Sequence, residues 1–184
     1  MRIRKTTETD LARIMQIYAR ARDFMAKTGN PNQWGPTKWP PEALIRNDIK
    51  DGNSYVCVND DEVVVGTFFY VRGKDIEPTY RDITEGGWIG GSDYGVVHRL
   101  ASDGSEKGIG RFCLDCAFDQ CRHLRIDTHT DNKVMQNLLA KLGFTRCGII
   151  HVVEDNYPRF AYEKAEQSGS MSNATCSGGA LPCP

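Results

Sequence analysis

A glycine-containing loop in the middle of the chain has the residue types of an anion site. The segment Gly104–Gly110 reads GSEKGIG and separates an apolar run from a segment with helical periodicity. The first N–H groups of a helix have no intrahelical partner, and the helix dipole favours negative charge there. Glycine also lets the backbone approach an anion closely. The loop therefore predicts a phosphate site at the start of the following helix.

Two common nucleotide motifs do not fit this loop. The P-loop places Gly-Lys directly before Ser or Thr, whereas Lys107 precedes Gly108 and no Ser or Thr follows in the required place. The dinucleotide fingerprint needs a third glycine where Cys113 stands. From the loop alone, the plain alternative is a tight turn that enters a helix and binds nothing.

A second segment, downstream of the loop, has residues at both ends that typically begin and end a helix. Asp131 or Asn132 suits the N-cap, and Gly143 suits the position that ends the helix. Apolar residues between them fall at helical spacing and form one stripe, namely Met135, Leu138, Leu139 and Leu142.

The loop and this helix together resemble the GNAT superfamily of N-acetyltransferases. Ser105–Gly110 stands where that family has its Q/R-x-x-G-x-G/A acyl-CoA motif, and Asn132–Phe144 matches its N-x(10)-G-F segment in length. The specific part covers residues 96–144, and the resemblance extends over roughly residues 1–164. It implies transfer of an acetyl group from acetyl-CoA to a primary amine of a small molecule or peptide by direct attack. The alternatives are a CoA-binding module of the same fold with little or no turnover, and an interaction domain whose loop binds nothing.

Strand and helix patterns alternate in an order that suits an α/β (α+β mixed) fold with a central mixed sheet flanked by helices. The strands are expected over Met1–Lys5, Ser54–Asn59, Glu62–Arg72, Tyr94–Ala101, Leu124–Thr128, Thr145–Glu154 and Arg159–Lys164. The helices are expected from Thr9 or Asp10 to Lys27, and over Glu42–Lys50, Ile109–Cys121 and Asn132–Leu142. The resemblance implies that the fourth and fifth strands splay apart and that acyl-CoA lies in the gap. We expect one domain over 1–164 and a flexible tail over 165–184, which has no periodicity.

The composition is that of a globular protein and argues against several classes of partner. The chain has 184 residues, 40% of them hydrophobic and 26% charged, with a formal net charge of −1. That charge argues against a nucleic-acid partner, which a basic stripe would indicate. No run approaches ~18 consecutive apolar residues, so we expect no membrane span. The N-terminal stretch lacks the apolar run of a signal peptide, so we expect a cytoplasmic protein.

The seven cysteines are expected to be reduced thiols in that compartment. Cys113, Cys116 and Cys121 are close enough in sequence to suggest a metal or redox site. They stand among apolar helix residues, however, where free cysteine behaves as a small core hydrophobe. A zinc site would also need a second pair at a recognised spacing, and the sequence has none. We therefore expect no metal.

The resemblance implies a cofactor site made mostly of main-chain groups. The residues concerned are Leu100, Ala101, Ser102, Ser105, Lys107, Gly108, Ile109, Gly110, Arg111 and Asn132. The amides at 107–110 would hold the pyrophosphate of acetyl-CoA, and the strand residues 100–102 would pair with the pantetheine arm and polarise the thioester carbonyl. Lys107 and Arg111 either add positive charge there or are solvated surface charges. Asn132 either reaches the pantetheine arm or is a plain N-cap.

The residue that deprotonates the amine is less well determined. The family often has a tyrosine seven residues after the asparagine, where this chain has Leu139. The candidates for catalysis are Tyr94, His98, Asp127 and His129. His98 titrates near neutral pH but also fits a buried core position on the face of Val96 and Leu100, and Asp127 alternatively pairs with Arg99 or Arg125. His129 alternatively is a surface turn residue.

Two long polar and aromatic segments, Asn30–Trp39 and Glu85–Asp93, are expected to select the substrate. Trp34 is the candidate for a wall of the acceptor pocket, unless it only pins its loop to the core. The final hairpin is expected to offer an edge strand for a possible homodimer.

Overall fold

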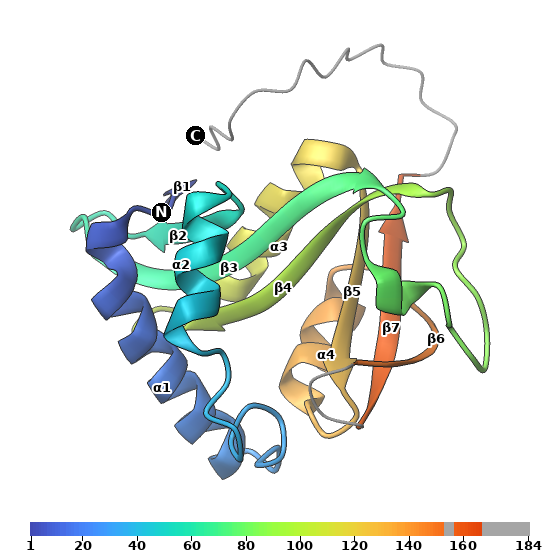
Figure 1. Ribbon diagram of the computed structural model, residues 1–184, viewed down its shortest axis with the longest axis horizontal. Helices are drawn as coiled ribbons and strands as arrows, with labels where there is room; N and C mark the ends of the chain where they lie inside the picture. The colour runs from blue at the N-terminus through green and yellow to red at the C-terminus, as the bar shows by residue number, and fades with distance from the viewer. Residues whose placement is uncertain (153–156, 167–184) are drawn as a thin grey trace.

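The computed structural model describes residues 1–152 and 157–166 (Figure 1). The strands are β1 (Arg2–Lys5), β2 (Ser54–Val58), β3 (Val64–Lys74), β4 (Asp93–Ser102), β5 (His123–His129), β6 (Thr145–His151) and β7 (Pro158–Ala165). The helices are α1 (Leu11–Lys27), α2 (Glu42–Lys50), α3 (Ile109–Cys121) and α4 (Lys133–Lys141), and short 3-10 turns cover η1 (Glu8–Asp10) and η2 (Pro78–Tyr80). Almost all of the predicted tail, and the last two residues of the strand predicted over Thr145–Glu154, lie outside the described residues.

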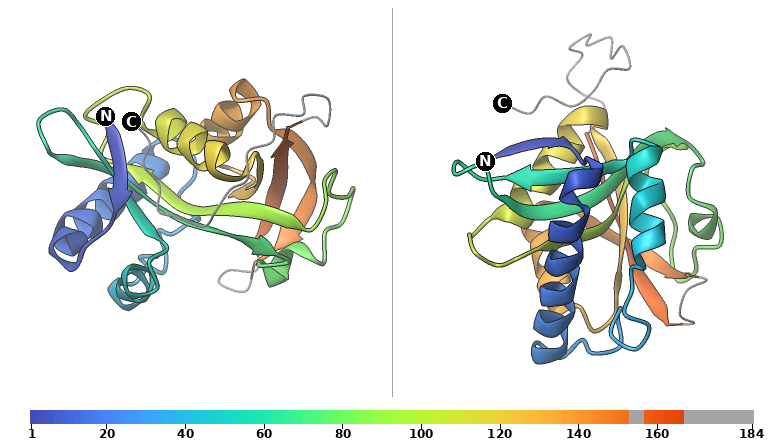
Figure 2. Two further views of the ribbon diagram at one scale, coloured as in Figure 1. Left: turned by 90° about the horizontal axis from the view of Figure 1, so that it is seen from above. Right: turned by 60° about the vertical axis from the view of Figure 1, so that its left-hand side comes forward.

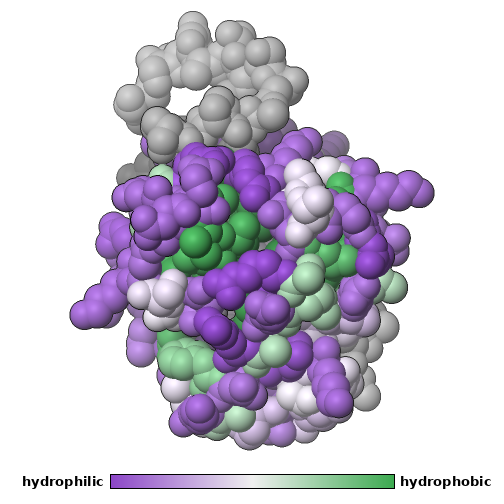
Figure 3. All heavy atoms as spheres, turned by 90° about the vertical axis from the view of Figure 1, so that its left-hand side faces the viewer, coloured by the Kyte–Doolittle hydropathy of each residue, from purple (hydrophilic) through white to green (hydrophobic). Residues whose placement is uncertain are grey.

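The strands form one mixed sheet, as predicted. Their order is β1-β2-β3-β4-β5-β7-β6, and every neighbouring pair is antiparallel except β4 and β5, which are parallel. Helices α1 and α2 cover one face of the sheet, and α3 and α4 cover the other (Figure 2). The outer surface on the α1 side is mostly hydrophilic, with hydrophobic side chains gathered in separate areas (Figure 3). No helix in the described ranges is long and apolar enough to cross a bilayer.

Strands β4 and β5 separate soon after they meet. Their ladder holds only two pairs, Gly95 with Leu124 and Val96 with Arg125, although both strands continue beyond them. The β4 backbone also bulges after His98: Phe69 pairs with His98 but Thr67 pairs with Ala101, and the intervening Arg99 has a positive φ of 54°. The bulge interrupts the alternation that the sequence implied between His98 and Leu100. The backbone beyond His98 is therefore directed into the space between the two strands.

The close approach of β4 and β5 at their start depends on a glycine. A Cβ atom at Gly95 would lie 2.8 Å from Cys121 Sγ, from Leu124 Cδ2 and from Tyr70 Cε2. We expect Gly95→Ala to lower the free energy of unfolding by about 1–3 kcal/mol, because an extra carbon in a filled core forces its neighbours off their rotamers. Urea denaturation checks this against Gly87→Ala, where no atom lies within 4 Å of the added carbon. Equal midpoints for the two variants would contradict the packing that we describe.

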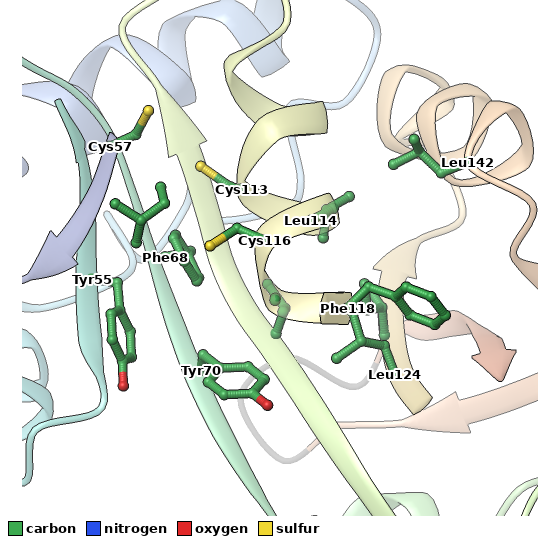
Figure 4. Close-up of a cluster of buried hydrophobic side chains, with 14 of the residues drawn as sticks. Tyr55, Cys57, Phe68, Tyr70, Cys113, Leu114, Cys116, Phe118, Leu124 and Leu142 are labelled. Carbon is green, nitrogen blue, oxygen red and sulfur yellow. The ribbon is translucent and has the colours of Figure 1, made fainter. Parts of the chain in front are cut away.

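The main core lies between α3 and the sheet. Cys113, Leu114 and Phe118 on α3 are buried against Phe68 and Tyr70 of β3 (Figure 4). The cysteines of this helix therefore pack as apolar side chains, as the sequence predicted. Within the described residues, no group of His, Cys, Asp and Glu side chains could hold a metal ion.

Most of the described cysteines are free thiols, namely Cys57, Cys113, Cys121 and Cys147. Cys116 is disulfide-bonded, so the expectation of a reduced thiol is wrong at this position. That expectation came from the inferred compartment alone, and the sequence offers no local pattern that separates Cys116 from its neighbours.

Candidate functional site

A cavity of about 630 Å³ opens where β4 and β5 separate. Its walls come from the end of β4, the end of β5, the last turns of α1, the loop that follows α1 and the first turns of α4. In Figure 1 the loop after α1 lies toward the start of α4, below the point where the two strands diverge. One cavity is therefore bounded both by the main chain of a splayed strand and by a loop far away in sequence.

One end of the cavity is formed by residues of the predicted cofactor segment. Leu100, Ala101 and Ser102 line it, and so do Gly104 and Gly110. Glycine suits position 110 because a Cβ atom there would lie only 3.2 Å from Cδ2 of Leu138.

Helix α3 starts beside this end of the cavity, at an N-cap glycine. Gly108 has a left-handed φ of 86°, and the first helical bond runs from the Phe112 N–H to its carbonyl at 2.9 Å. The N–H groups before Phe112 precede that bond, which is the arrangement that holds anions at helix starts.

Apart from Asn132, the other predicted cofactor residues are not part of the cavity lining. Lys107 and Gly108 are exposed, Ile109 is buried in the core, and Arg111 lies on the surface with its Nε 3.3 Å from Asp115. Ser105 donates from its N–H and its hydroxyl to Asp103, at 2.9 and 2.6 Å.

Asn132 caps α4 and lines the cavity, and its contact with the pantetheine arm stays a prediction. Its Oδ1 accepts the Met135 N–H at 3.0 Å, which makes it the N-cap of α4, and it also lines the cavity. Its amide nitrogen donates to Gln33 Oε1 at 2.9 Å, and Asn30 donates to the same oxygen at 2.7 Å. Gln33 therefore fastens the loop after α1 to the start of α4. No local pattern predicts this contact, which joins residues 99 positions apart.

His98 is the centre of a polar cluster inside the cavity. Its Nε2 lies 3.0 Å from Glu77 Oε2, and its Nδ1 lies 3.6 Å from Asp127 Oδ1. The first distance is a hydrogen bond and the second is too long for one. Because a carboxylate only accepts, Nε2 carries the hydrogen, which leaves the Nδ1 lone pair to accept a proton. Asp127 then lies beside the nitrogen that would become positively charged.

Hydrogen bonds hold both carboxylates beside His98 in place. Burial raises the pKa of Glu77, but hydrogen bonds from His98 and Thr79 outweigh burial and lower that pKa to about 2. Tyr80 donates its hydroxyl to Asp127 at 2.9 Å. Burial, followed by the charge of Asp127, raises the pKa of Tyr80 well above its ordinary value, so that the phenol stays a donor. Glu77 is therefore an ionised acceptor at neutral pH, and Asp127 is held by the Tyr80 hydroxyl.

Asp127 does not have the partners that the sequence suggested as its structural alternative. Arg99 pairs instead with Asp48 at 2.6 Å, and Arg125 pairs with Glu163 at 3.0 Å. Pairing with either arginine was wrong because each has a nearer carboxylate: Arg99 lies in the β4 bulge beside Asp48, and Arg125, two residues from Asp127 on β5, is held by Glu163.

Two of the four catalytic candidates do not line the cavity. His129 is buried, with its Nδ1 accepting the Asp131 N–H at 3.1 Å, so it is not the surface turn residue of the alternative interpretation. Tyr94 is also buried, with the Arg125 guanidinium 4.1 Å from its ring centre. The cavity therefore brings together His98 and Asp127 and leaves out Tyr94 and His129.

Sequence reasoning missed Glu77 and Tyr80, although both contact the His98–Asp127 pair. They stand in the stretch Glu77-Pro78-Thr79-Tyr80, which has no periodicity and lies in a long loop. The only signal was Pro78, which favours a turn, and a turn does not show which side chains face inward.

Of the two segments predicted to select the substrate, one lines the cavity and the other does not. Trp34 packs edge-on against Tyr18, with 5.8 Å between ring centres, and it also lines the cavity; its contact with an acceptor stays a prediction. The segment Glu85–Asp93 contributes nothing to the described cavity lining; it is tied instead to β7, where the Gly90 N–H donates to Glu163 at 3.2 Å.

Leu139, at the family's tyrosine position, is fully buried in the main core. The apolar residues that α4 presents to the cavity are Val134, Met135 and Leu138. No proton donor on this helix face therefore replaces the tyrosine.

Comparison with known proteins gives matches to solved structures alone. No protein-family model matches the chain, and no curated protein matches it. A GNAT-family acetyltransferase from Streptococcus agalactiae 2603 is 30% identical, with a TM-score of 0.75, over 90% of this chain and 95% of the other. A putative acetyltransferase from Staphylococcus aureus Mu50 is 24% identical, with a TM-score of 0.63, over 89% of this chain and 97% of the other.

A third structure shares the fold at lower sequence identity. A ribosomal-protein-alanine N-acetyltransferase from Brucella melitensis shares 18% identity and a TM-score of 0.55, over 89% of this chain and 99% of the other. At that identity the likeness concerns the fold alone. The identity and coverage of the streptococcal structure, together with the splayed strands and the glycine loop, show that the chain belongs to the GNAT family of acetyltransferases.

Proposed function

We propose that this protein is an N-acetyltransferase that moves an acetyl group from acetyl-CoA to a primary amine of a small molecule or peptide by direct attack. The observation that carries the proposal is His98, which lines the cavity with its Nδ1 3.6 Å from Asp127 Oδ1 while Glu77 fixes its tautomer. Family membership supports acyl transfer, and the cluster supports an amine as the acceptor.

An amine needs a base because most primary amines are protonated at neutral pH, with a pKa near 10.4 for a lysine side chain. His98 Nδ1 would accept the proton, and Asp127 would stabilise the resulting imidazolium at 3.6 Å. Glu77 keeps the ring oriented through the bond to Nε2. The neutral amine could then attack directly.

The residues that would hold acetyl-CoA lie on the other side of the cavity. Acetyl-CoA would supply the acetyl group as a thioester. The main chain of Leu100–Ser102 would bind the pantetheine arm, and one of its N–H groups would donate to the thioester oxygen, on which charge develops. The start of α3, capped by Gly108, would hold the pyrophosphate.

The second candidate function is a CoA-binding module with little or no turnover. Leu139 favours it, because this buried side chain cannot protonate a departing thiolate. A thiol pKa of about 8.5 nevertheless makes thiolate a fair leaving group near neutral pH. The first candidate therefore does not require a proton donor on α4.

Thermal unfolding with acetyl-CoA, followed by thiol release over a panel of primary amines, separates the two candidates. Acetyl-CoA at about 100 times its dissociation constant should add about 2.7 kcal/mol of stability, and thiol should appear only when an amine is present. ADP, which lacks the pantetheine arm, serves as the comparison ligand and should stabilise less. Stabilisation without thiol release would favour the binding module, and no stabilisation would contradict both.

Three expectations about the location and the partners of the protein stay predictions. These are a cytoplasmic location, the absence of a nucleic-acid partner and a possible homodimer. Strand β6 is the outermost strand of the sheet, which supports the dimer because an edge strand has unpaired main-chain groups.

A further inference from the structure

The exposed apolar side chains of this protein are concentrated at the mouth of the cavity. Among the described residues, the large hydrophobic side chains that remain exposed are Phe24, Val63, Ile89, Val134 and Tyr157. Phe24, Val134 and Tyr157 line the cavity, and their exposed fractions are 52%, 48% and 45%. Apolar side chains that gather in this way around a cavity indicate a ligand-binding surface.

The wall beside them is fixed before any ligand arrives. Trp34 packs on Tyr18, and the Tyr18 hydroxyl donates to the carbonyl of Arg99 at 3.1 Å, in the β4 bulge. The neighbouring Gln33 is held by Asn132 and Asn30. The indole is therefore tied to the strand that carries His98 and to the start of α4. A fixed aromatic wall selects for shape and for apolar area, because the protein loses little entropy when the ligand binds.

The polar groups inside the cavity suit one positive charge. Glu77 and Asp127 flank His98 and would attract a single ammonium group. Arg99 is neutralised by Asp48 at 2.6 Å, and Arg20, with 60% of its side chain exposed, lies 3.9 Å from Asp103. These two arginines therefore each face a carboxylate, and the third arginine that lines the cavity, Arg159, is buried.

We infer that the acceptor is a primary amine joined to an aromatic or similarly apolar body, an arylalkylamine, with its nitrogen at His98 and its ring against Phe24, Trp34 and Val134. This inference rests on the proposed function and names its substrate class. Polyamines and amino acids are disfavoured, because the first need further carboxylates and the second would bring their own carboxylate close to Glu77 and Asp127.

The experiment compares kcat/KM for acetylation of four amines by the wild-type protein. We expect 2-phenylethylamine to exceed ethylamine, which lacks the ring, by about 10- to 100-fold. It should also exceed spermidine and phenylalanine. Faster acetylation of spermidine or phenylalanine would overturn the inference and leave the proposed function intact. Absence of turnover with every amine would overturn both.

Matched valine variants locate the effect in the structure. Val134→Ala and Val63→Ala make the same change at similar exposed fractions, 48% and 44%, but only Val134 lines the cavity. We expect Val134→Ala to lower the preference for 2-phenylethylamine over ethylamine by about threefold to tenfold, and Phe24→Ala by about tenfold. Val63→Ala should leave the preference unchanged. If Phe24→Ala and Val134→Ala both keep the wild-type preference, the apolar surface does not bind the acceptor.

Discussion

Replacing His98 by alanine should lower kcat/KM for amine acetylation by about 100-fold to 10,000-fold, the range that general base catalysis supplies. The reason is the position of Nδ1, which is the ring nitrogen left to accept a proton once Nε2 donates to Glu77 at 3.0 Å. The loss should shrink as pH rises, because without a base the rate follows the fraction of amine that is already neutral. A rate that rises about tenfold per pH unit in the variant, against a flatter wild-type profile, is the expected signature.

Two further variants divide the roles inside the His98 cluster. Asp127→Asn should cost less than His98→Ala, because Asp127 stabilises a charge at 3.6 Å but does not receive the proton. His151→Ala is the matched control, since His151 is exposed at the end of β6 and does not line the cavity. If His98→Ala and Asp127→Asn both keep full activity between about pH 6 and pH 9, the base lies elsewhere.

The largest effect on stability should come from Glu163→Gln. Glu163 is 1% exposed and accepts hydrogen bonds from His123 Nε2 at 2.6 Å, Arg125 Nε at 3.0 Å and the Gly90 N–H at 3.2 Å. Neutralising it leaves the buried Arg125 guanidinium without its counter-charge, and breaking a buried pair in this way costs about 3–5 kcal/mol. Urea denaturation at neutral pH measures the loss. Glu166→Gln, which removes a surface partner of Arg122, should leave the midpoint nearly unchanged.

The same carboxylate gives the protein a defined sensitivity to acid. Burial raises the pKa of Glu163, but bonds from His123, from the Ile89 N–H and from Arg125 outweigh burial and lower the pKa from 4.5 to about 2. A lowered pKa contributes stability that is present above the unfolded value of 4.5 and is lost as pH falls toward 2. The difference in unfolding free energy between wild type and Glu163→Gln should therefore shrink across that window. A difference that stays constant with pH would contradict the ionised state of Glu163.

Capping and turn residues in the sequence were sufficient to predict most of the helices and strands. Helices α2 and α3 have the predicted bounds because Pro40-Pro41 precedes one and Gly108 caps the other. Asn132 was predicted as an N-cap for the same reason, since a cap is made within one turn of chain. Features that depend on neighbours within a few residues are therefore recoverable from sequence.

The site was predicted only in part because its contacts join distant segments. The Glu77–His98 bond spans 21 residues and the Gln33–Asn132 bond spans 99, and no periodicity marks either one. The bulge at Arg99 rests on a positive φ at an arginine, a residue type that does not signal that conformation. For the loop that supplies Glu77 and Tyr80, the sequence predicts only irregular structure.

The most direct test of this account is to follow an acetyl group labelled in acetyl-CoA with the wild-type protein and 2-phenylethylamine. The account predicts that the label appears in an N-acetyl amide, one equivalent for each thiol released, and that His98→Ala slows both together. Thiol release with the label in acetate would show hydrolysis instead of transfer. That result, or the absence of labelled amide with every primary amine tested, would contradict the assignment of this cavity as an amine acetylation site.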